Sequence, residues 1–419
     1  MSDLVSAGVA HVGETEGSAM RHDGPVRTAP PLPDTRITPA CEADEAPPGS
    51  CARSVAARVE RVLDTHLAQR RTESAVLTAA FADEVVHHLT RLVLGGGKRL
   101  RPAFLWCGWH AAGAADVSED AVLEIGAALE LLQGCALIHD DLMDSATSRR
   151  GRPALHVAFQ AVHRSRGASG SAEAFGYSAA LLAGDLALAW AQDLWEQTDL
   201  PQHSRQRTRR LWQAMRTEMV AGQYLDLRSQ ADGASCPDEA LRTAYLKSGL
   251  YTVQRPLLLG ATLGGASADL SAGLERVGRC AGLAFHLADD LADLFGDEQQ
   301  LGRRTGEDVR QGKPTYLMTV ALEAASRGGH RTAQQVLTRA QGNPELSEDG
   351  LDEVRAAVTQ VGARGHVEKL VRELADEARE AVAESAMPRA AADSLTALVG
   401  ATLRAAPPRH ASAEGVDPV

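Results

Sequence analysis

The stretch Ala136-Leu-Ile-His-Asp-Asp-Leu-Met-Asp144 follows an apolar segment with helical character, Glu124-Ile-Gly-Ala-Ala-Leu-Glu-Leu-Leu-Gln133. In a helix with 3.6 residues per turn, Asp140 and Asp144 share one face and Asp141 lies beside them. Three partly buried carboxylates repel one another and require a compensating cation. The stretch therefore predicts a cation site at the end of a packed helix.

A second acidic triplet repeats this pattern in Phe285-His-Leu-Ala-Asp-Asp-Leu-Ala-Asp293, within a more apolar run. A solvated helix end would explain one triplet, but two triplets in apolar helices are hard to explain as surface. If the helices face each other, their six carboxylates line one cavity. Such hard oxygen ligands suit Mg²⁺, which combines a few carboxylates with water and substrate phosphates. The expected metal ligands are Asp140, Asp141, Asp144, Asp289, Asp290 and Asp293.

The composition favours an all-α fold, a single large helical bundle around a central cavity. The chain has 419 residues with only 4% aromatic residues, while alanine and leucine are abundant, which favours helices over sheet. A net charge of −12 gives no indication of a nucleic-acid partner. No apolar run reaches about 18 residues, so we expect no membrane span. The scattered cysteines are interpreted as reduced thiols of a cytoplasmic protein.

Amphipathic helices are predicted for residues 55–405, which we treat as one domain. Residues 1–54 are rich in proline, glycine and acidic groups and lack a periodic apolar face, so we expect a disordered extension there. Residues 406–419 are interpreted as a disordered tail for the same reason. No strand alternation is evident.

Cationic side chains accompany the two triplets at several separate places. These are Lys98 and Arg101 after a triple glycine, Arg149 and Arg150 after the first triplet, Lys247, and Arg303 with Lys313 in a late glycine-punctuated loop. Metals and cations together bind multiply charged phosphates. Because both acidic helices are apolar around their triplets, a diphosphate with a hydrocarbon tail fits both properties. No nucleophile–base pair stands near the triplets, which favours chemistry with a metal-bound diphosphate leaving group.

These motifs resemble those of the all-trans isoprenyl diphosphate synthases (polyprenyl synthetases), most closely the bacterial geranylgeranyl diphosphate synthases. The resemblance extends over about residues 55–403. It rests on five motifs in order: Gly96-Gly-Lys-Arg-Leu-Arg-Pro102, the first triplet with Arg149-Arg150-Gly, Lys247-Ser248-Gly, the second triplet, and the loop from Gly302 to Lys313. His286 stands where the family usually has glutamine, and Arg303 where it usually has lysine.

The resemblance implies a role for each motif. The six aspartates would hold about three Mg²⁺ ions on an allylic diphosphate, with Mn²⁺ as a substitute. Asp140, Asp289, Arg149 and Lys247 are the expected catalytic residues. The expected substrate-binding residues are Lys98, Arg101, Gln133, Arg149, Arg150, Lys247, Ser248, His286, Arg303 and Lys313. Within this set, Lys98, Arg101 and Arg150 would hold isopentenyl diphosphate, with Gln133 where many members have histidine.

The implied activity is condensation of isopentenyl diphosphate with an allylic diphosphate by a cytoplasmic homodimer. Residues at the fourth and fifth positions before the first triplet often form the floor of the product tunnel in this family. Here they are Ala136 and Cys135. Both are small, so geranylgeranyl diphosphate is the expected product; farnesyl diphosphate and longer chains are alternatives. Two other functions stay open: a class I terpene cyclase and an inactive subunit of a heteromeric synthase.

Overall fold

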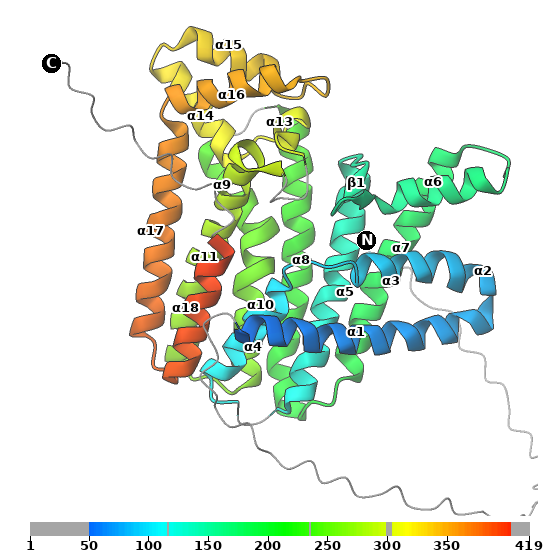
Figure 1. The fold of residues 1–419 in the computed structure, drawn as a ribbon. Helices are drawn as coiled ribbons and strands as arrows, with labels where there is room; N and C mark the ends of the chain where they lie inside the picture. The colour runs from blue at the N-terminus through cyan, green and yellow to red at the C-terminus, as the bar shows by residue number, and fades with distance from the viewer. Residues whose placement is uncertain (1–49, 115–116, 234–235, 299–303, 404–419) are drawn as a thin grey trace, which may run out of the picture. The chain divides into compact units, whose positions relative to one another are not determined.

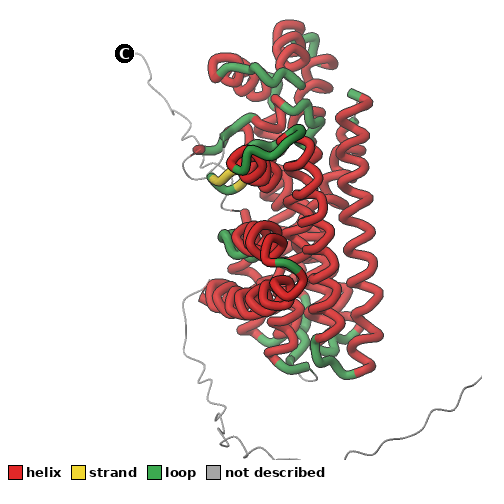
Figure 2. Tube along the Cα trace, turned by 90° about the vertical axis from the view of Figure 1, so that its right-hand side faces the viewer, coloured by secondary structure: helices red, strands yellow, loops and turns green. Residues whose placement is uncertain are grey.

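The computed structural model describes residues 50–114, 117–233, 236–298 and 304–403, and these are helical almost throughout (Figures 1 and 2). The predicted all-α fold is therefore confirmed. The first helix begins at Ser50, five residues before the predicted start of the domain. The expected N-terminal and C-terminal extensions lie almost entirely outside the described residues.

Helices make up nearly all of the regular structure of the described residues, with one pair of short strands in the first half of the chain. The first half of the chain contains α1 (Ser50–Leu77), α2 (Ala79–Phe81), η1 (Ala82–Val86), α3 (His87–Val93), α4 (Leu100–Ala111), α5 (Glu119–Met143), β1 (Ser148–Arg149), β2 (Arg152–Pro153), α6 (Leu155–Ser165) and α7 (Ala172–Gln197). The second half contains α8 (Gln202–Asp232), α9 (Pro237–Ala244), η2 (Tyr245–Gln254), α10 (Arg255–Leu263), α11 (Ala268–Phe295), α13 (Glu307–Arg310), α14 (Tyr316–Arg327), α15 (Arg331–Ala340), α16 (Glu348–Gln360), α17 (Ala363–Glu384) and α18 (Arg389–Leu403).

The two acidic triplets lie on long helices, α5 and α11, whose starts are capped by serine. The Ser118 side chain accepts from Ala121 N, and the Ser267 side chain accepts from Leu270 N, which satisfies a backbone donor that the first turn leaves open. Helix α5 packs most extensively against α7, whereas α11 packs against α17 and η2. Most of α5 is buried, so its carboxylate-bearing end emerges directly from the apolar core.

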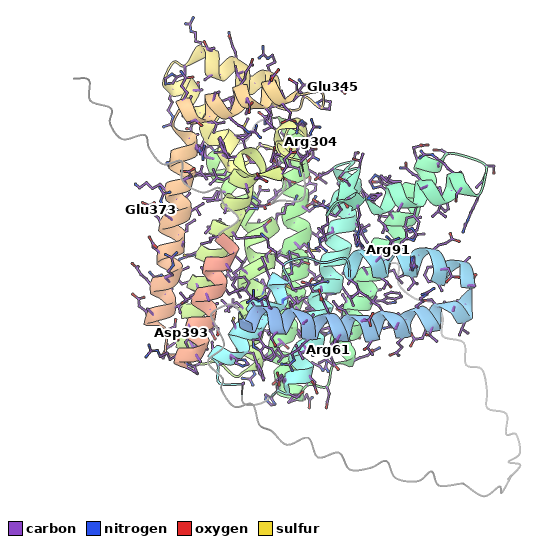
Figure 3. The ribbon with its side chains drawn as sticks, in the orientation of Figure 1. Arg61, Arg91, Arg304, Glu345, Glu373 and Asp393 are labelled. Atoms are coloured by element: carbon purple, nitrogen blue, oxygen red, sulfur yellow. The ribbon has the colours of Figure 1, made fainter. Side chains whose placement is uncertain are left out.

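The surface of this bundle is charged, as its sequence periodicity requires. Arg61 on α1, Glu373 on α17 and Asp393 on α18, labelled in Figure 3, are exposed. The opposite faces of these helices supply buried apolar residues such as Val59 and Val371. This division of polar and apolar faces is the pattern from which the helices were predicted.

Three local features differ from a plain helical bundle, and one of them is the five-residue π-helix η1. The segment η2 is a ten-residue π-helix, a wide form that is rare and often marks functional sites. The strands β1 and β2 form one short antiparallel pair, although the sequence predicts no strand. The turn between them consists of Arg150 and Gly151, both with positive φ, as in the tight turns that join hairpin strands.

Two of the described helices are long and apolar enough to cross a membrane by length and composition alone. These are α5 and α7, although the sequence predicts no such helix. The most apolar window of α5 is 78% buried inside the protein and that of α7 is 44% buried. Helix α5 is buried to the extent expected of a core helix in a bundle. Packing inside the protein therefore explains why it is apolar.

Candidate active site

Aspartates from both triplets line one cavity of about 780 Å³. Its wall is built from both acidic helices, η2, the glycine turn before α4, the hairpin and the segment after α13. Predicted site residues on this wall are Lys98, Arg101, Gln133, Ala136, Asp140, Arg149, Arg150, Lys247, Ser248, His286, Asp289, Asp290 and Lys313. Arg303 lies outside the described residues.

The first triplet is held by cations of the chain itself. Arg149 donates from Nε to Asp141 Oδ1 at 2.7 Å and from Nη2 to Asp140 Oδ2 at 3.1 Å. Lys313 Nζ lies 2.6 Å from Asp144 Oδ2. Residue Asp144 follows the last residue of α5 and caps it, so the triplet spans the end of the helix and opens toward several partners.

Burial and these cations shift the pKa values of the first triplet in opposite directions. Burial by itself would raise the pKa of Asp140, but Lys247, Lys313 and Arg149 together lower it to about 2. Burial raises the pKa of Asp141 and of Asp144 despite Arg149 and Lys313. The site therefore keeps Asp140 ionised and gains stability when further positive charge reaches its neighbours.

The second triplet combines an exposed carboxylate with a buried one. Asp289 is exposed and Asp290 is buried, and His286 Nε2 lies 3.4 Å from Asp290 Oδ1. Burial, reinforced by Asp308 and Asp289, raises the pKa of Asp290 well above its usual value. Asp290 Oδ2 is buried with no hydrogen-bond partner among the described residues. A cation bound at this wall would offset the free-energy cost of burying the Asp290 carboxylate.

Asp293 contacts the backbone at the start of α13. Its Oδ2 accepts from Asp308 N at 3.2 Å, and its carbonyl accepts from Gly306 N at 2.7 Å. These bonds attach the start of α13 to α11. The third carboxylate of this triplet therefore holds the segment that carries Lys313 to the cavity.

Lys247 lies between the two acidic helices because η2 packs unusually close to its neighbours. A Cβ atom on Gly222 of α8 would lie 2.4 Å from Lys247 N, so only glycine permits this approach. Lys247 Nζ lies 3.2 Å from Asp140 Oδ1 and 2.7 Å from Asp226 Oδ2. Burial lowers the pKa of Lys247, but Asp140 and Asp226 raise it above its usual value.

Two residues of the site are absent from the set predicted from sequence. Asp226 binds Lys247, and Gln223 Nε2 donates to Asp140 Oδ1 at 3.3 Å. Both lie on one face of α8 and line the cavity. The sequence places two polar residues three positions apart on one helix face, next to Gly222. This spacing does not reveal that the face is directed toward α5.

The hairpin directs its two arginines to different places. Arg149 in β1 reaches the first triplet, whereas Arg150 donates to the carbonyl of Gly96 in the glycine turn. Gly97 has φ +131°, and a Cβ atom there would lie 2.8 Å from Arg150 Nη2. The tight turn therefore separates two cationic groups that are adjacent in sequence.

Arg150 belongs to a second cationic group with Lys98 and Arg101. Arg101 Nη2 donates to Thr252 Oγ1 at 2.9 Å, and its guanidinium lies 4.2 Å from the ring centre of Tyr251. These contacts hold Arg101 at the cavity wall. The structure thus provides two places for anionic groups, one beside the first triplet and one beside the glycine turn.

The two residues predicted to set product length lie in different environments. Ala136 lines the cavity. Cys135 is buried, and its Sγ lies 3.7 Å from His139 Nδ1. Burial raises the pKa of Cys135 to about 12, so its thiol is neutral and acts as a small apolar group.

No group of three or more histidine, cysteine, aspartate or glutamate side chains in the described part of the chain forms a preformed metal site. Mg²⁺ does not require one, because it is usually held by one or two carboxylates with water and substrate phosphates. Buried oxygens of Asp141, Asp144 and Asp290 lack hydrogen-bond partners among the described residues. The donor set, all carboxylate, therefore fits a hard divalent cation.

Known proteins similar to this chain are isoprenyl diphosphate synthases. A Corynebacterium glutamicum geranylgeranyl pyrophosphate synthase, solved with isoprenyl diphosphate and magnesium, is 33% identical, with a TM-score of 0.78 over 83% of this chain and 99% of that one. The short chain isoprenyl diphosphate synthase of Methanothermobacter thermautotrophicus is 32% identical over 56% of this chain and 66% of its own length. The farnesyl diphosphate synthase of Escherichia coli is 32% identical over 64% and 84%.

The chain thus spans about two thirds of the length of the curated relatives that it matches first, 66% and 65%. The family model for polyprenyl synthetases matches residues 83–354. That range contains the glycine turn, both acidic triplets, Lys247 and Lys313. The chain belongs to the polyprenyl synthetase family.

Proposed function

We propose that this protein is a trans-prenyltransferase that condenses isopentenyl diphosphate with an allylic diphosphate. The product that fits best is geranylgeranyl diphosphate. The observation that carries the proposal is that carboxylates from both acidic helices, Asp140, Asp289 and Asp290, line one cavity together with two separate cationic groups. One diphosphate must leave and a second must stay, so a site for each is required.

The ions would be held by the aspartates of both triplets, about three Mg²⁺ per site, with Mn²⁺ as a substitute. Bound divalent ions supply the positive charge that stabilises a departing diphosphate. Arg149 and Lys247, which contact Asp140, orient the allylic diphosphate beside them. Asp293 supports this wall through its bonds to the start of α13.

Lys98, Arg101 and Arg150 hold isopentenyl diphosphate with its double bond toward the allylic carbon. Breaking the allylic carbon–oxygen bond leaves a cation, and the double bond supplies the electron pair for the new carbon–carbon bond. The released diphosphate accepts the proton that restores an alkene. The apolar residues around Ala136 receive the lengthening chain and keep water from the cation.

One assay tests this proposal against the alternatives. The protein is incubated with isopentenyl diphosphate, farnesyl diphosphate and Mg²⁺, and the products are separated by chromatography. We expect an elongated diphosphate. A cyclic hydrocarbon would identify a class I terpene cyclase, and no product would identify an inactive subunit. The second cationic group favours the synthase, because a cyclase binds one diphosphate.

We also propose that the protein is a cytoplasmic homodimer. Leu181 and Leu182 on α7 are 43% and 65% exposed, and Tyr177 on the same helix is 50% exposed. An apolar helix face of this kind is typical of a surface that another chain covers. Light scattering after size-exclusion chromatography should give the mass of two chains, and Leu182→Glu should reduce it to one.

A further inference from the structure

Arg99 is a buried arginine in an unfavourable backbone conformation, located between the glycine turn and α4. It has φ 47°, and the whole residue is only 4% exposed. The left-handed region is costly for a residue with a Cβ atom and persists where surrounding contacts compensate. Arg99 is the N-cap residue of α4, yet its side chain makes no cap hydrogen bond. Its guanidinium has other partners.

Those partners come from three different segments. Arg99 Nη2 donates to the Val93 carbonyl at 2.7 Å, which joins the two ends of the glycine turn. Arg99 Nη1 donates to Glu130 Oε2 of α5 at 2.6 Å, and its Nε donates to Glu60 Oε1 of α1 at 3.1 Å. The Arg99 guanidinium therefore fixes the turn to two helices at once.

Helix α5 transmits this attachment to the metal-binding end of the cavity. Glu130 precedes Asp140 by ten residues on α5, about 15 Å along the helix axis. Lys98 and Arg101 flank Arg99 in sequence and line the cavity. A rigid helix that binds Arg99 near its middle and carries Asp140 near its C-terminal end therefore sets the separation of the two anion sites.

We propose that Arg99 and Glu130 are positioning residues for the isopentenyl diphosphate subsite. They place Lys98 and Arg101 relative to the first acidic triplet without contacting the reacting atoms. This inference rests on the proposed function. It assigns to the first arginine of the glycine-turn motif, Arg99, a role distinct from those of Lys98 and Arg101.

The charge of Glu130 makes Arg99 necessary at this place. Glu130 lines the cavity and is 4% exposed, and its Oε1 has no hydrogen-bond partner among the described residues. A buried carboxylate beside an anion subsite would repel a diphosphate unless a cation compensates it. Arg99 supplies that cation and, in the same contact, fixes the turn.

Three variants separate positioning from stability. Arg99→Met removes the positive charge and the hydrogen bonds to Val93, Glu130 and Glu60. It leaves the Glu130 carboxylate buried without Arg99. Arg99→Met/Glu130→Met removes the pair, and replacing a buried ion pair by apolar residues of similar volume often restores stability. Arg91→Met, on the exposed face of α3 (labelled in Figure 3), is the matched control.

Steady-state kinetics are measured for both substrates, together with thermal unfolding. We expect Arg99→Met to raise the KM for isopentenyl diphosphate about tenfold or more, since small misplacements of positioning groups have large effects, while the KM for farnesyl diphosphate is unchanged. The double variant should recover its unfolding temperature but keep the raised KM. Arg91→Met should match the wild type in every measurement.

The inference alone would be overturned by equal changes in both KM values, or by a double variant that recovers normal KM together with stability. Unchanged kinetics in a folded Arg99→Met protein would do the same. Failure of the wild-type protein to elongate farnesyl diphosphate would overturn the proposed function, and this inference with it.

Discussion

Lys247 of η2 and Asp226 of α8 form an ion pair in the wall of the cavity, with 2.7 Å between Nζ and Oδ2. The same ammonium group lies 3.2 Å from Asp140 Oδ1. Asp226 therefore fixes a lysine that also reaches the first triplet. The pair keeps the half-buried lysine charged, and its charge can serve an anionic substrate.

Asp226→Asn should weaken use of the allylic substrate. The variant loses a charge-assisted hydrogen bond, which contributes roughly 1.5–3 kcal/mol, so kcat/KM for farnesyl diphosphate should fall about ten- to a hundredfold. Asp232→Asn, at the exposed end of the same helix, is the control and should retain normal kinetics. Equal values for the two variants would show that Lys247 is positioned without Asp226.

Each acidic triplet should be indispensable. Asp140→Ala and Asp289→Ala should each reduce turnover by about two orders of magnitude or more, because metal clamps contribute several kcal/mol to a transition state. Activity should also disappear on chelation of divalent ions and return with Mg²⁺ or Mn²⁺. Circular dichroism would establish that both variants are folded. Near-normal turnover in either folded variant would refute the two-sided metal site.

The two hairpin arginines should serve different substrates, because Arg149 contacts the first triplet and Arg150 contacts Gly96. Arg150→Ala should raise the KM for isopentenyl diphosphate roughly ten- to a hundredfold. Arg149→Ala should instead affect the allylic substrate. Initial rates with one substrate varied at a time measure the difference. A change confined to the allylic KM in Arg150→Ala would contradict this assignment.

Cys135→Phe should shorten the product by one or more isoprene units without abolishing catalysis. Cys135 is buried one position before Ala136, which lines the cavity, and an aromatic ring there would fill space that the lengthening chain requires. Chromatography of the dephosphorylated alcohols measures the change. An active variant with unchanged product length would place the floor of the tunnel elsewhere.

Asp290→Asn should stabilise the metal-free protein while it impairs catalysis. Burial raises the pKa of Asp290, so the folded state binds its proton more tightly than the unfolded chain. The free energy of unfolding therefore decreases as the pH rises from about 4, the ordinary carboxyl pKa, through the raised folded value. At neutral pH the folded protein bears the free-energy cost of a buried, ionised Asp290. The neutral amide of Asp290→Asn removes that cost.

The measurement is the unfolding midpoint without divalent ions. Asp290→Asn should exceed the wild type at pH 7 by roughly 2–4 °C for each kcal/mol removed, and the difference should narrow toward pH 4. The control Asp64→Asn, on the exposed face of α1, should leave the midpoint unchanged. A lower midpoint for Asp290→Asn at pH 7 would show that the carboxylate stabilises the metal-free fold.

The sequence determined the helices, the two acidic triplets and the kinds of cation that accompany them. Apolar periodicity and helix caps are local properties, and a triplet such as Asp140, Asp141 and Asp144 occupies one helical face whatever the rest of the chain does. The repetition of the triplet was sufficient to predict a shared cavity. The hairpin around Arg150 was not predicted, because two-residue strands leave no alternating pattern to read.

Only the tertiary structure decided which charges meet. Asp226 pairs with Lys247 because Gly222 lets η2 approach α8 closely, and Asp293 bonds to the start of α13 although it repeats the pattern of a metal ligand. Arg99 lines the same cavity as Lys98 and Arg101, but its guanidinium donates to the Val93 carbonyl and to Glu130. The partner of a charge depends on which helices pack together. Helix packing is determined by the sum of many weak contacts along the whole chain, so no single sequence motif predicts it.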